Sequence, residues 1–222
     1  PPSGSRLRLR LLDRPNRQYD CAWQHIVKVE LFEQMILAQA EKFTAQGNFN
    51  EAFEYYDYLQ TNYPQMPTLR GSVDKFLYRH ASAELKADRT DNAFSLLVEL
   101  IDREASVPNL ERAFETVAMR VIAERVRQER FDAARAAIAV VREKFAGTPL
   151  PRVDEIRDRM IDQARSLRDL GSQKLSAGDF REARAASYKA VAIWPELEGA
   201  AALAREIDGK YPLSVVGVML GT

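Results

Sequence analysis

The sequence predicts a mostly α-helical protein made of helical hairpins in series, and two related stretches carry this prediction. The first stretch, residues 46–64, opens at a glycine and ends before a proline. Its apolar residues at helical spacing are Ala52, Phe53, Tyr56 and Leu59. The second stretch, residues 177–195, repeats its plan. The matching pairs are Gly47 and Gly178, Asn48 and Asp179, Phe49 and Phe180, Glu51 and Glu182, Ala52 and Ala183, and Pro64 and Pro195. Agreement at both ends indicates an internal repeat.

An apolar helix pattern also precedes each of these stretches, and two weaker copies lie between them. The preceding patterns are Ile36, Ala40 and Phe43, and Leu167, Leu170, Gly171 and Leu175. The weaker copies centre on Ala93 and Ala134, where Asp88 and Glu129 replace the turn glycine. From residue 30 to 208 this pattern resembles tetratricopeptide (TPR) repeats. Because the marker alanines are spaced more widely than the roughly 34 residues of a standard unit, we expect an irregular TPR-like α-hairpin solenoid of about four repeats.

Residues 1–25 are predicted to hold an N-terminal extension and a short β-hairpin. The segment RLRLRLL alternates, with Leu7, Leu9 and Leu11 facing inward and Arg6, Arg8 and Arg10 facing out. After the turn-forming DRPNR, the side chains that share one face are Tyr19, Cys21 and Trp23. A lone hairpin is marginally stable in water. We therefore expect it either to lean on the first helix through Trp23 or to belong to a small β module.

The helical repeats are predicted to occupy residues 26–209. The helical period begins at Ile26 or Lys28, with an apolar stripe formed by Val29, Phe32, Ile36, Ala40 and Phe43. Prolines and glycines then separate the later helices, which we predict at residues 69–87, 91–104, 110–128, 131–145 and 153–177, with the fourth repeat's second helix ending at Ile193. A further helix at residues 196–209 takes the place of a capping helix, which stacked arrays need at their ends.

Residues 210–222 form an apolar tail, in which the run at 215–221 is rich in β-branched residues. It is shorter than the roughly 20 residues of a membrane span, and such runs are typical of buried strands. Either the tail packs on the last helix or it begins a following domain, and we expect the latter. Helical repeats followed by this run resemble the start of an ABC-transporter extracytoplasmic solute-binding domain. The chain is then a fragment of a larger protein.

The composition of the 222 residues limits the function classes. The chain is 46% hydrophobic and 29% charged, with 32 Lys and Arg against 32 Asp and Glu, so no global field favours nucleic acid. The single Cys21 leaves the compartment open: extracytoplasmic if the solute-binding resemblance holds, otherwise cytoplasmic. His25 and His80 have no partner at metal-ligand spacing, and no nucleotide-binding or nucleophile motif is present. We expect no enzyme activity, no cofactor and no metal.

The TPR resemblance implies a binding groove lined by the first helix of each hairpin. The candidate groove residues are Lys75, Tyr78, Lys86, Met119, Arg127, Arg165 and Arg168. The same carry-over places Leu37, Glu41, Ser82 and Thr116 in the groove. Their mostly positive charge favours an acidic or C-terminal peptide, although these cations can equally be solvated side chains.

The predicted function is therefore a non-catalytic TPR-like protein–protein interaction or scaffold module. An alternative is an accessory N-terminal region of an extracytoplasmic peptide-type ABC-transporter solute-binding protein. A third hypothesis is nucleic-acid binding through the hairpin, which has five arginines between Arg6 and Arg17. No aromatic residues interleave with these arginines to stack on bases, so this third hypothesis has the least support.

Overall fold

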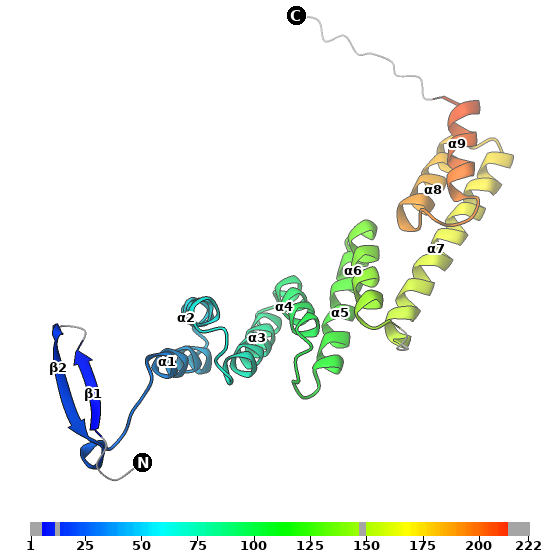
Figure 1. Cartoon of the computed structure of the whole chain (residues 1–222). Helices are drawn as coiled ribbons and strands as arrows, with labels where there is room; N and C mark the ends of the chain where they lie inside the picture. Colours follow the sequence, from blue (N-terminus) through cyan, green and yellow to red (C-terminus); the bar gives the residue numbers. More distant parts are fainter. Residues whose placement is uncertain (1–5, 12–13, 147–149, 213–222) are drawn as a thin grey trace, which may run out of the picture. The chain divides into compact units, whose positions relative to one another are not determined.

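The computed structural model describes residues 6–11, 14–146 and 150–212 (Figure 1). In this part of the chain two antiparallel strands precede nine α-helices, and the helices follow one another as hairpins. The predicted fold class is therefore confirmed. The chain divides into two compact units, Pro1–Phe76 and Leu77–Thr222. The apolar run at 215–221 lies outside the described residues, so the expectation of a following domain stays a prediction.

The predicted β-hairpin is present as β1 (Arg6–Leu11) and β2 (Arg14–Ala22), followed by a 3-10 turn, η1 (Trp23–His25). Leu7 lies opposite Cys21 and Leu9 opposite Tyr19, whereas Arg8 lies opposite Asp20, whose Oδ1 accepts a hydrogen bond from Arg8 Nε at 3.2 Å. The apolar and arginine faces are thus those that the sequence predicts. Leu9 stays 40% exposed and Trp23 38% exposed. The exposure of Trp23 disfavours the first of the two expected arrangements, packing on the first helix, and the second, a small β module, stays a prediction.

Helix α1 (Phe32–Gln46) begins later than predicted, and residues 26–31 before it are not helical. This segment contains Ile26, Val27 and Val29, whose β-branched side chains disfavour helix, and Leu31 at the N-cap provides no side-chain hydrogen bond. The first turn instead starts at the Leu31 carbonyl, which accepts from the backbone N–H groups of residues 34 and 35. The predicted stripe is consequently wrong at its start: Val29 and Phe32 are exposed.

The core of the first unit lies between α1, α2 (Phe49–Asn62) and the first part of α3 (Leu69–Lys86). Tyr56 is 2% exposed, and its ring centroid lies 5.0 Å from that of Phe76. As predicted, Ala52 and Leu59 share its buried face, whereas Tyr58 is exposed on another side of α2.

Two further predictions about these helices are wrong. Phe53 is exposed, because it lies one residue, about 100° around the helix, from the buried Ala52. Leu37, predicted for the groove, is buried in α1. Its neighbour Glu41 accepts a hydrogen bond from Ser72 Oγ at 2.7 Å, which ties α1 to the start of α3.

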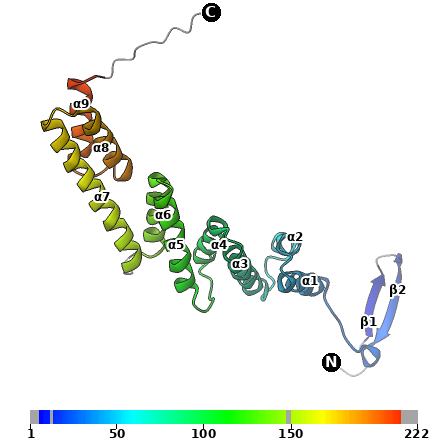
Figure 2. The ribbon, with the colours of Figure 1, turned by 180° about the vertical axis from the view of Figure 1, so that it is seen from behind.

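The second unit contains the remainder of α3 and six further helices, which Figure 1 labels and Figure 2 shows from behind. They are α4 (Thr90–Asp102), α5 (Leu110–Arg127), α6 (Phe131–Lys144), α7 (Pro151–Ser176), α8 (Phe180–Ile193) and α9 (Ala200–Lys210). Phe114 of α5 has no exposed surface, and its ring lies 5.4 Å from Phe94 of α4 and 5.2 Å from Phe145 beyond α6. Aromatic packing of this kind joins successive hairpins.

Helix α9 occupies the predicted capping position but starts four residues late, because Gly199 at φ 78° sets its N-terminus after a turn through Leu197. Arg184 Nε donates to Asp208 Oδ1 at 2.9 Å and so joins α8 to α9. The ring of Phe180 stacks on Tyr211 with 3.5 Å between centroids. Phe180 is therefore half-buried against the end of α9, and not enclosed between α7 and α8 as its repeat position suggests.

The turns between paired helices share one backbone conformation. Gly47 and Gly178 have φ values of 81° and 80°, and Asp88 and Glu129 take the same left-handed conformation at 63° and 57°. The weaker repeats therefore keep the turn although they lack glycine. A side-chain cap is present at Asp179, whose Oδ1 accepts from the Glu182 N–H at 3.3 Å, whereas Asn48 at the matching position makes no such bond.

We expect Glu129→Gly to stabilise the second unit by about 1 kcal/mol, because glycine relieves the left-handed strain of a residue with a Cβ. The ion pair that is lost, Glu129 with Lys189, is largely exposed and contributes little. Glu129→Ala is the matched control, since it removes the ion pair and keeps the strain. Urea unfolding followed by circular dichroism measures both variants. Equal midpoints for the two would contradict this account of the turn.

At Gly171, in contrast, we expect glycine to be required, so that an added methyl group destabilises the fold. A Cβ on this buried glycine would lie 2.7 Å from Ser187 Oγ and 3.3 Å from the Ala183 carbonyl oxygen, so Gly171→Ala should lower the free energy of unfolding by about 1 to 3 kcal/mol. In Gly209→Ala the new Cβ meets nothing within 4 Å, and the gain in helix propensity should stabilise by up to about 1 kcal/mol. Thermal melts of both variants test the close approach of α7 and α8, and a stabilising Gly171→Ala would refute it.

Candidate functional site

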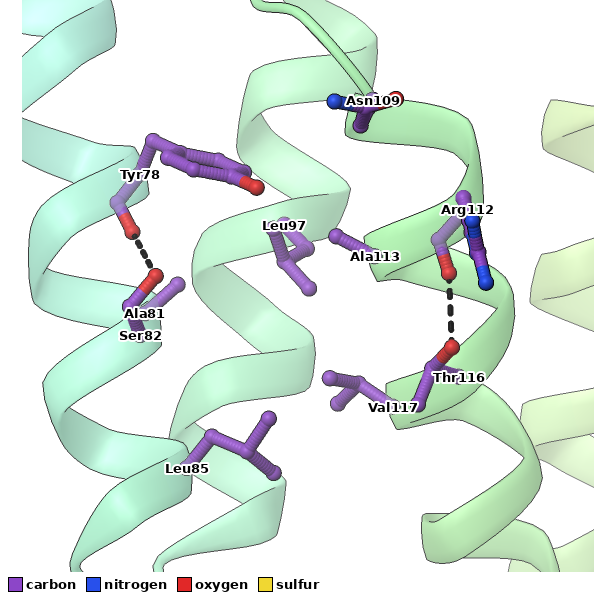
Figure 3. Close-up of a pocket in the computed structure, with 10 residues that line it drawn as sticks. All are labelled: Tyr78, Ala81, Ser82, Leu85, Leu97, Asn109, Arg112, Ala113, Thr116 and Val117. Carbon is purple, nitrogen blue, oxygen red and sulfur yellow. Dashed lines mark hydrogen bonds between the residues drawn. The ribbon is translucent and has the colours of Figure 1, made fainter.

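A pocket of about 340 Å³ lies in the second unit between the later part of α3 and the first half of α5 (Figure 3). Leu97 of α4 contributes to its wall. In Figure 3, Tyr78 and Leu85 reach towards the pocket from α3, and Ala113 and Val117 face them from α5. The full lining consists of Tyr78, Ala81, Ser82, Leu85, Leu97, Asn109, Arg112, Ala113, Thr116 and Val117.

The inner wall of the pocket is apolar, because residues four apart on each helix share a face. Ala81 and Leu85 form one such pair on α3, and Ala113 and Val117 form the other on α5. Ala81 and Val117 are buried together with Leu97. Two of the facing residues are alanines, whose short side chains leave space between the helices. The pocket therefore results from alanines at positions where larger side chains would fill the space.

The rim of the pocket is polar and offers hydrogen-bond acceptors and donors. Ser82 Oγ donates to the Tyr78 carbonyl oxygen at 2.9 Å, and Thr116 Oγ1 donates to the Arg112 carbonyl oxygen at 2.8 Å. These bonds to the preceding helical turn use the hydroxyl protons, so both oxygens can still accept from a ligand. The Tyr78 hydroxyl has no partner in the described part of the chain, so it can both donate and accept.

Arg112 is the one charged side chain that lines this pocket. It is exposed, and among the described residues no carboxylate forms an ion pair with it. Asn109 lies beside it at the N-cap of α5, in the left-handed conformation at φ 61°. The pocket therefore combines an apolar interior with a positively charged rim.

A second, polar cavity of about 550 Å³ lies where α5 ends, beside the start of α4. Four arginines line it with three carboxylates. Arg120 pairs with Asp88 at 2.5 Å, and Arg125 pairs with Asp91 at 2.7 Å. These pairs join α5 to the hairpin before it. Since most of its charge is satisfied internally, this cavity is better explained as a contact between repeats than as a ligand site.

The predicted groove residues are distributed over different surroundings. Tyr78 lines the pocket, together with Ser82 and Thr116. Lys75 and Lys86 are exposed on different parts of α3, and Met119 is half-buried in α5 without lining the pocket.

The three predicted arginines have acidic partners on their own helices. Arg127 lines the polar cavity and pairs with Glu124 at 2.6 Å. Arg165 pairs with Asp162, and Arg168 with Asp169 at 2.7 Å. Arg168 also donates to the Glu198 carbonyl oxygen at 3.0 Å. Neighbouring carboxylates therefore offset much of the positive charge that the groove residues alone suggest.

Two rim residues, Asn109 and Arg112, are absent from the predicted groove set. Helical spacing contains the signal for Arg112, which lies one turn before the predicted Thr116 and therefore on the same face of α5. Asn109 follows Pro108 at the start of this helix, and its position depends on a turn conformation that the residue types do not determine.

Beside the pocket, the last turn of α3 contains a buried carboxylate. Glu84 accepts from Arg89 Nε at 2.7 Å and from Asn92 Nδ2 at 2.8 Å. The hydrogen bonds from Arg89 lower the pKa of Glu84 to about 2, against the opposing effect of burial and with further help from Asn92. Glu84 therefore stays ionised and fixes the end of α3 to the start of α4.

Stability should depend on this carboxylate in acid. Because the pKa of Glu84 in the folded chain lies below its ordinary value of 4.5, its contribution is complete above that pH and is lost as the pH falls towards about 2. Allowing for the exposed Arg89, we expect Glu84→Gln to cost about 2 kcal/mol at neutral pH and progressively less in acid. Glu155→Gln, in an exposed pair with Arg159, is the control. Urea unfolding across this pH range tests the dependence, and a constant difference would contradict it.

Within the described ranges, no group of three or more His, Cys, Asp or Glu side chains is placed to hold a metal ion. No helix there combines the length and apolar character that crossing a membrane requires.

Comparison with known proteins gives a structural likeness but no match in sequence. No protein-family model matches the sequence. No curated protein matches it with significant similarity. Among solved structures the chain is similar to the TPR2AB-domain:pHSP90 complex of yeast Sti1, at 14% identity and a TM-score of 0.25, over 80% of this chain and 70% of that chain. The fold described above rests on the helix pairs of this chain itself.

Proposed function

We propose that this chain is a non-catalytic protein-interaction module, and that the pocket between α3 and α5 receives a side chain of a partner peptide. The observation that carries the proposal is the pocket's composition: an apolar interior, three hydroxyl groups and one unpaired cation at the rim. Such a site can bind an apolar side chain and hold the neighbouring peptide groups by hydrogen bonds.

The charge of the rim selects the chemistry of the peptide. Arg112 offers a guanidinium that can bind a carboxylate through two parallel hydrogen bonds, and no acidic residue lines the pocket to compete with it. The favoured ligand is therefore a segment in which an apolar residue lies next to an acidic side chain or to a C-terminal carboxylate. This agrees with the acidic partner that the sequence predicts, but it rests on Arg112, which lies outside the predicted set.

The other two hypotheses gain less from the structure. In the hairpin, Arg8 pairs with Asp20, so one of the three arginines on the predicted nucleic-acid face is already engaged. The solute-binding hypothesis depends on a run that lies outside the described residues and stays a prediction. We therefore make peptide binding the proposed function.

A displayed library of random peptides, selected on the immobilised chain, tests the proposal. We expect enrichment of sequences with an apolar residue beside Asp, Glu or the free C-terminus. For an enriched peptide labelled with fluorescein, anisotropy should show at least tenfold weaker binding to Arg112→Glu, since this change places a like charge against the ligand carboxylate. Ala113→Leu should weaken binding similarly because it fills the pocket.

The matched control is Arg165→Glu, which makes the same charge change at an exposed arginine of α7 outside the pocket. Binding should be within about twofold of the unmodified chain for this variant. Failure to enrich any peptide, or sensitivity to Arg165→Glu without sensitivity to Arg112→Glu, would overturn the proposed site. Thermal melts of each variant show whether the fold is retained.

A further inference from the structure

Exposed large apolar side chains are concentrated in the first unit. In the described part of the chain, all of them except Leu170 and Tyr188 lie between residues 9 and 58. Val27 is fully exposed, and Met35 is 56% exposed. Clusters of this kind usually mark a surface that another protein covers.

The hairpin contributes one uncovered apolar face. The strand register places four side chains on it: Leu7, Leu9, Tyr19 and Cys21. The opposite face has arginines, and between residues 6 and 25 there are five arginines against two aspartates. Among the described residues no hydrogen bond, ion pair or ring contact joins this hairpin to α1 or α2. The hairpin is therefore basic and apolar on one side, and none of these interactions holds its apolar face against the helices that follow.

The first helix pair contributes a second uncovered surface, which we call the N-terminal patch: Leu31, Phe32, Met35 and Tyr58. Phe32 and Tyr58 join α1 to α2 through an edge-to-face ring contact at 6.4 Å, and Met35 lies one helical turn after Phe32. All four side chains are exposed. The helices that bear the patch are acidic, with five carboxylates against one lysine between residues 32 and 62.

These two surfaces match each other in polarity and in charge. Two N-terminal patches would repel one another through their acidic helices, and two hairpins through their arginines. A basic hairpin against an acidic helix pair brings apolar side chains together and opposite charges around them. Charge complementarity therefore selects the hairpin as the occupant of the patch.

The linker between them, residues 26–31, decides which copy supplies the hairpin. It contains no glycine, proline, asparagine or aspartate, the residues that reverse a chain most readily. Ile26 and Leu31 at its ends are extended, and the chain bends once, at Val27. A linker of six residues that lacks the usual chain-reversing residues gives the hairpin little room to fold back on its own helices, and short hinges of this kind favour exchange between copies.

We propose that the hairpin of one copy packs its apolar face on the N-terminal patch of a second copy, and that the exchange is reciprocal. The result is a two-fold symmetric dimer in which each contact forms twice. This surface lies in the first unit, separate from the peptide pocket of the second unit. A test of the dimer is therefore independent of a test of the proposed peptide binding, and either proposal can fail without the other.

Sedimentation velocity of the full chain tests the dimer, at roughly 100 μM, where micromolar affinity would populate it. Met35→Glu on the patch and Leu9→Glu on the hairpin should each raise the dimer dissociation constant at least tenfold. Leu170→Glu, at an exposed leucine of the second unit, should leave it unchanged. Added salt should weaken the dimer because the charges around the contact are exposed. A monomer at all concentrations, or equal effects of Leu9→Glu and Leu170→Glu, would overturn the proposal.

Disulfide trapping identifies the two surfaces directly. A copy that keeps Cys21, its single cysteine, is mixed with a Cys21→Ala, Met35→Cys copy and oxidised with glutathione disulfide. We expect a covalent heterodimer, and a much lower yield when Leu170→Cys replaces Met35→Cys. In one chain that has both Cys21 and Met35→Cys, the exchange predicts linked dimers. A bond closed within a monomer would show that the hairpin folds back on its own patch and would overturn the exchange.

Discussion

Close contact at one alanine in each hairpin is the constraint on which the rest of this structure depends. Ala52, Ala93, Ala134 and Ala183 each have no exposed surface, and each lies near the start of the second helix of its pair. A methyl group lets two helix backbones approach more closely than a larger side chain would allow. Because interiors are packed at the density of organic crystals, this spacing in turn determines which neighbouring side chains fit.

In the second unit, small residues produce a close contact between two helices at one place and an open pocket at another. At Gly171 the absence of a side chain admits Ser187 to within 2.7 Å of the position that a Cβ would occupy. Ala81 of α3 and Ala113 of α5 line the pocket, where their short side chains leave open space between the helices. Whether a small residue gives a close helix contact or a pocket therefore depends on the separation of the helix backbones. The residue type alone does not specify this separation.

This dependence explains how far the sequence could predict the molecule. Period and turn residues located the helix pairs, because Gly47 and Gly178 need a left-handed conformation and the alanines mark the buried face. They placed the start of α1 wrongly, since the apolar pattern continues through Val29 while β-branching and a missing cap delay the helix. Carrying groove positions over one at a time included Tyr78, which lines the pocket, but not Arg112, which lines it too. It also counted Arg165 and Arg168 as free charge, although Asp162 and Asp169 lie beside them.

The distribution of charge separates the roles of the two units. In the second unit Arg120 and Arg125 pair with Asp88 and Asp91 of the preceding hairpin and so join helices to one another, whereas Arg112 forms no ion pair among the described residues. In the first unit the charges are segregated along the chain, with arginines in the hairpin and carboxylates in the helices that follow. Paired charges within a fold add little attraction for an outside partner, whereas segregated ones attract a complementary surface over about a Debye length. This distribution of charge supports the two proposed partner surfaces, the pocket rim around Arg112 and the uncovered faces of the first unit.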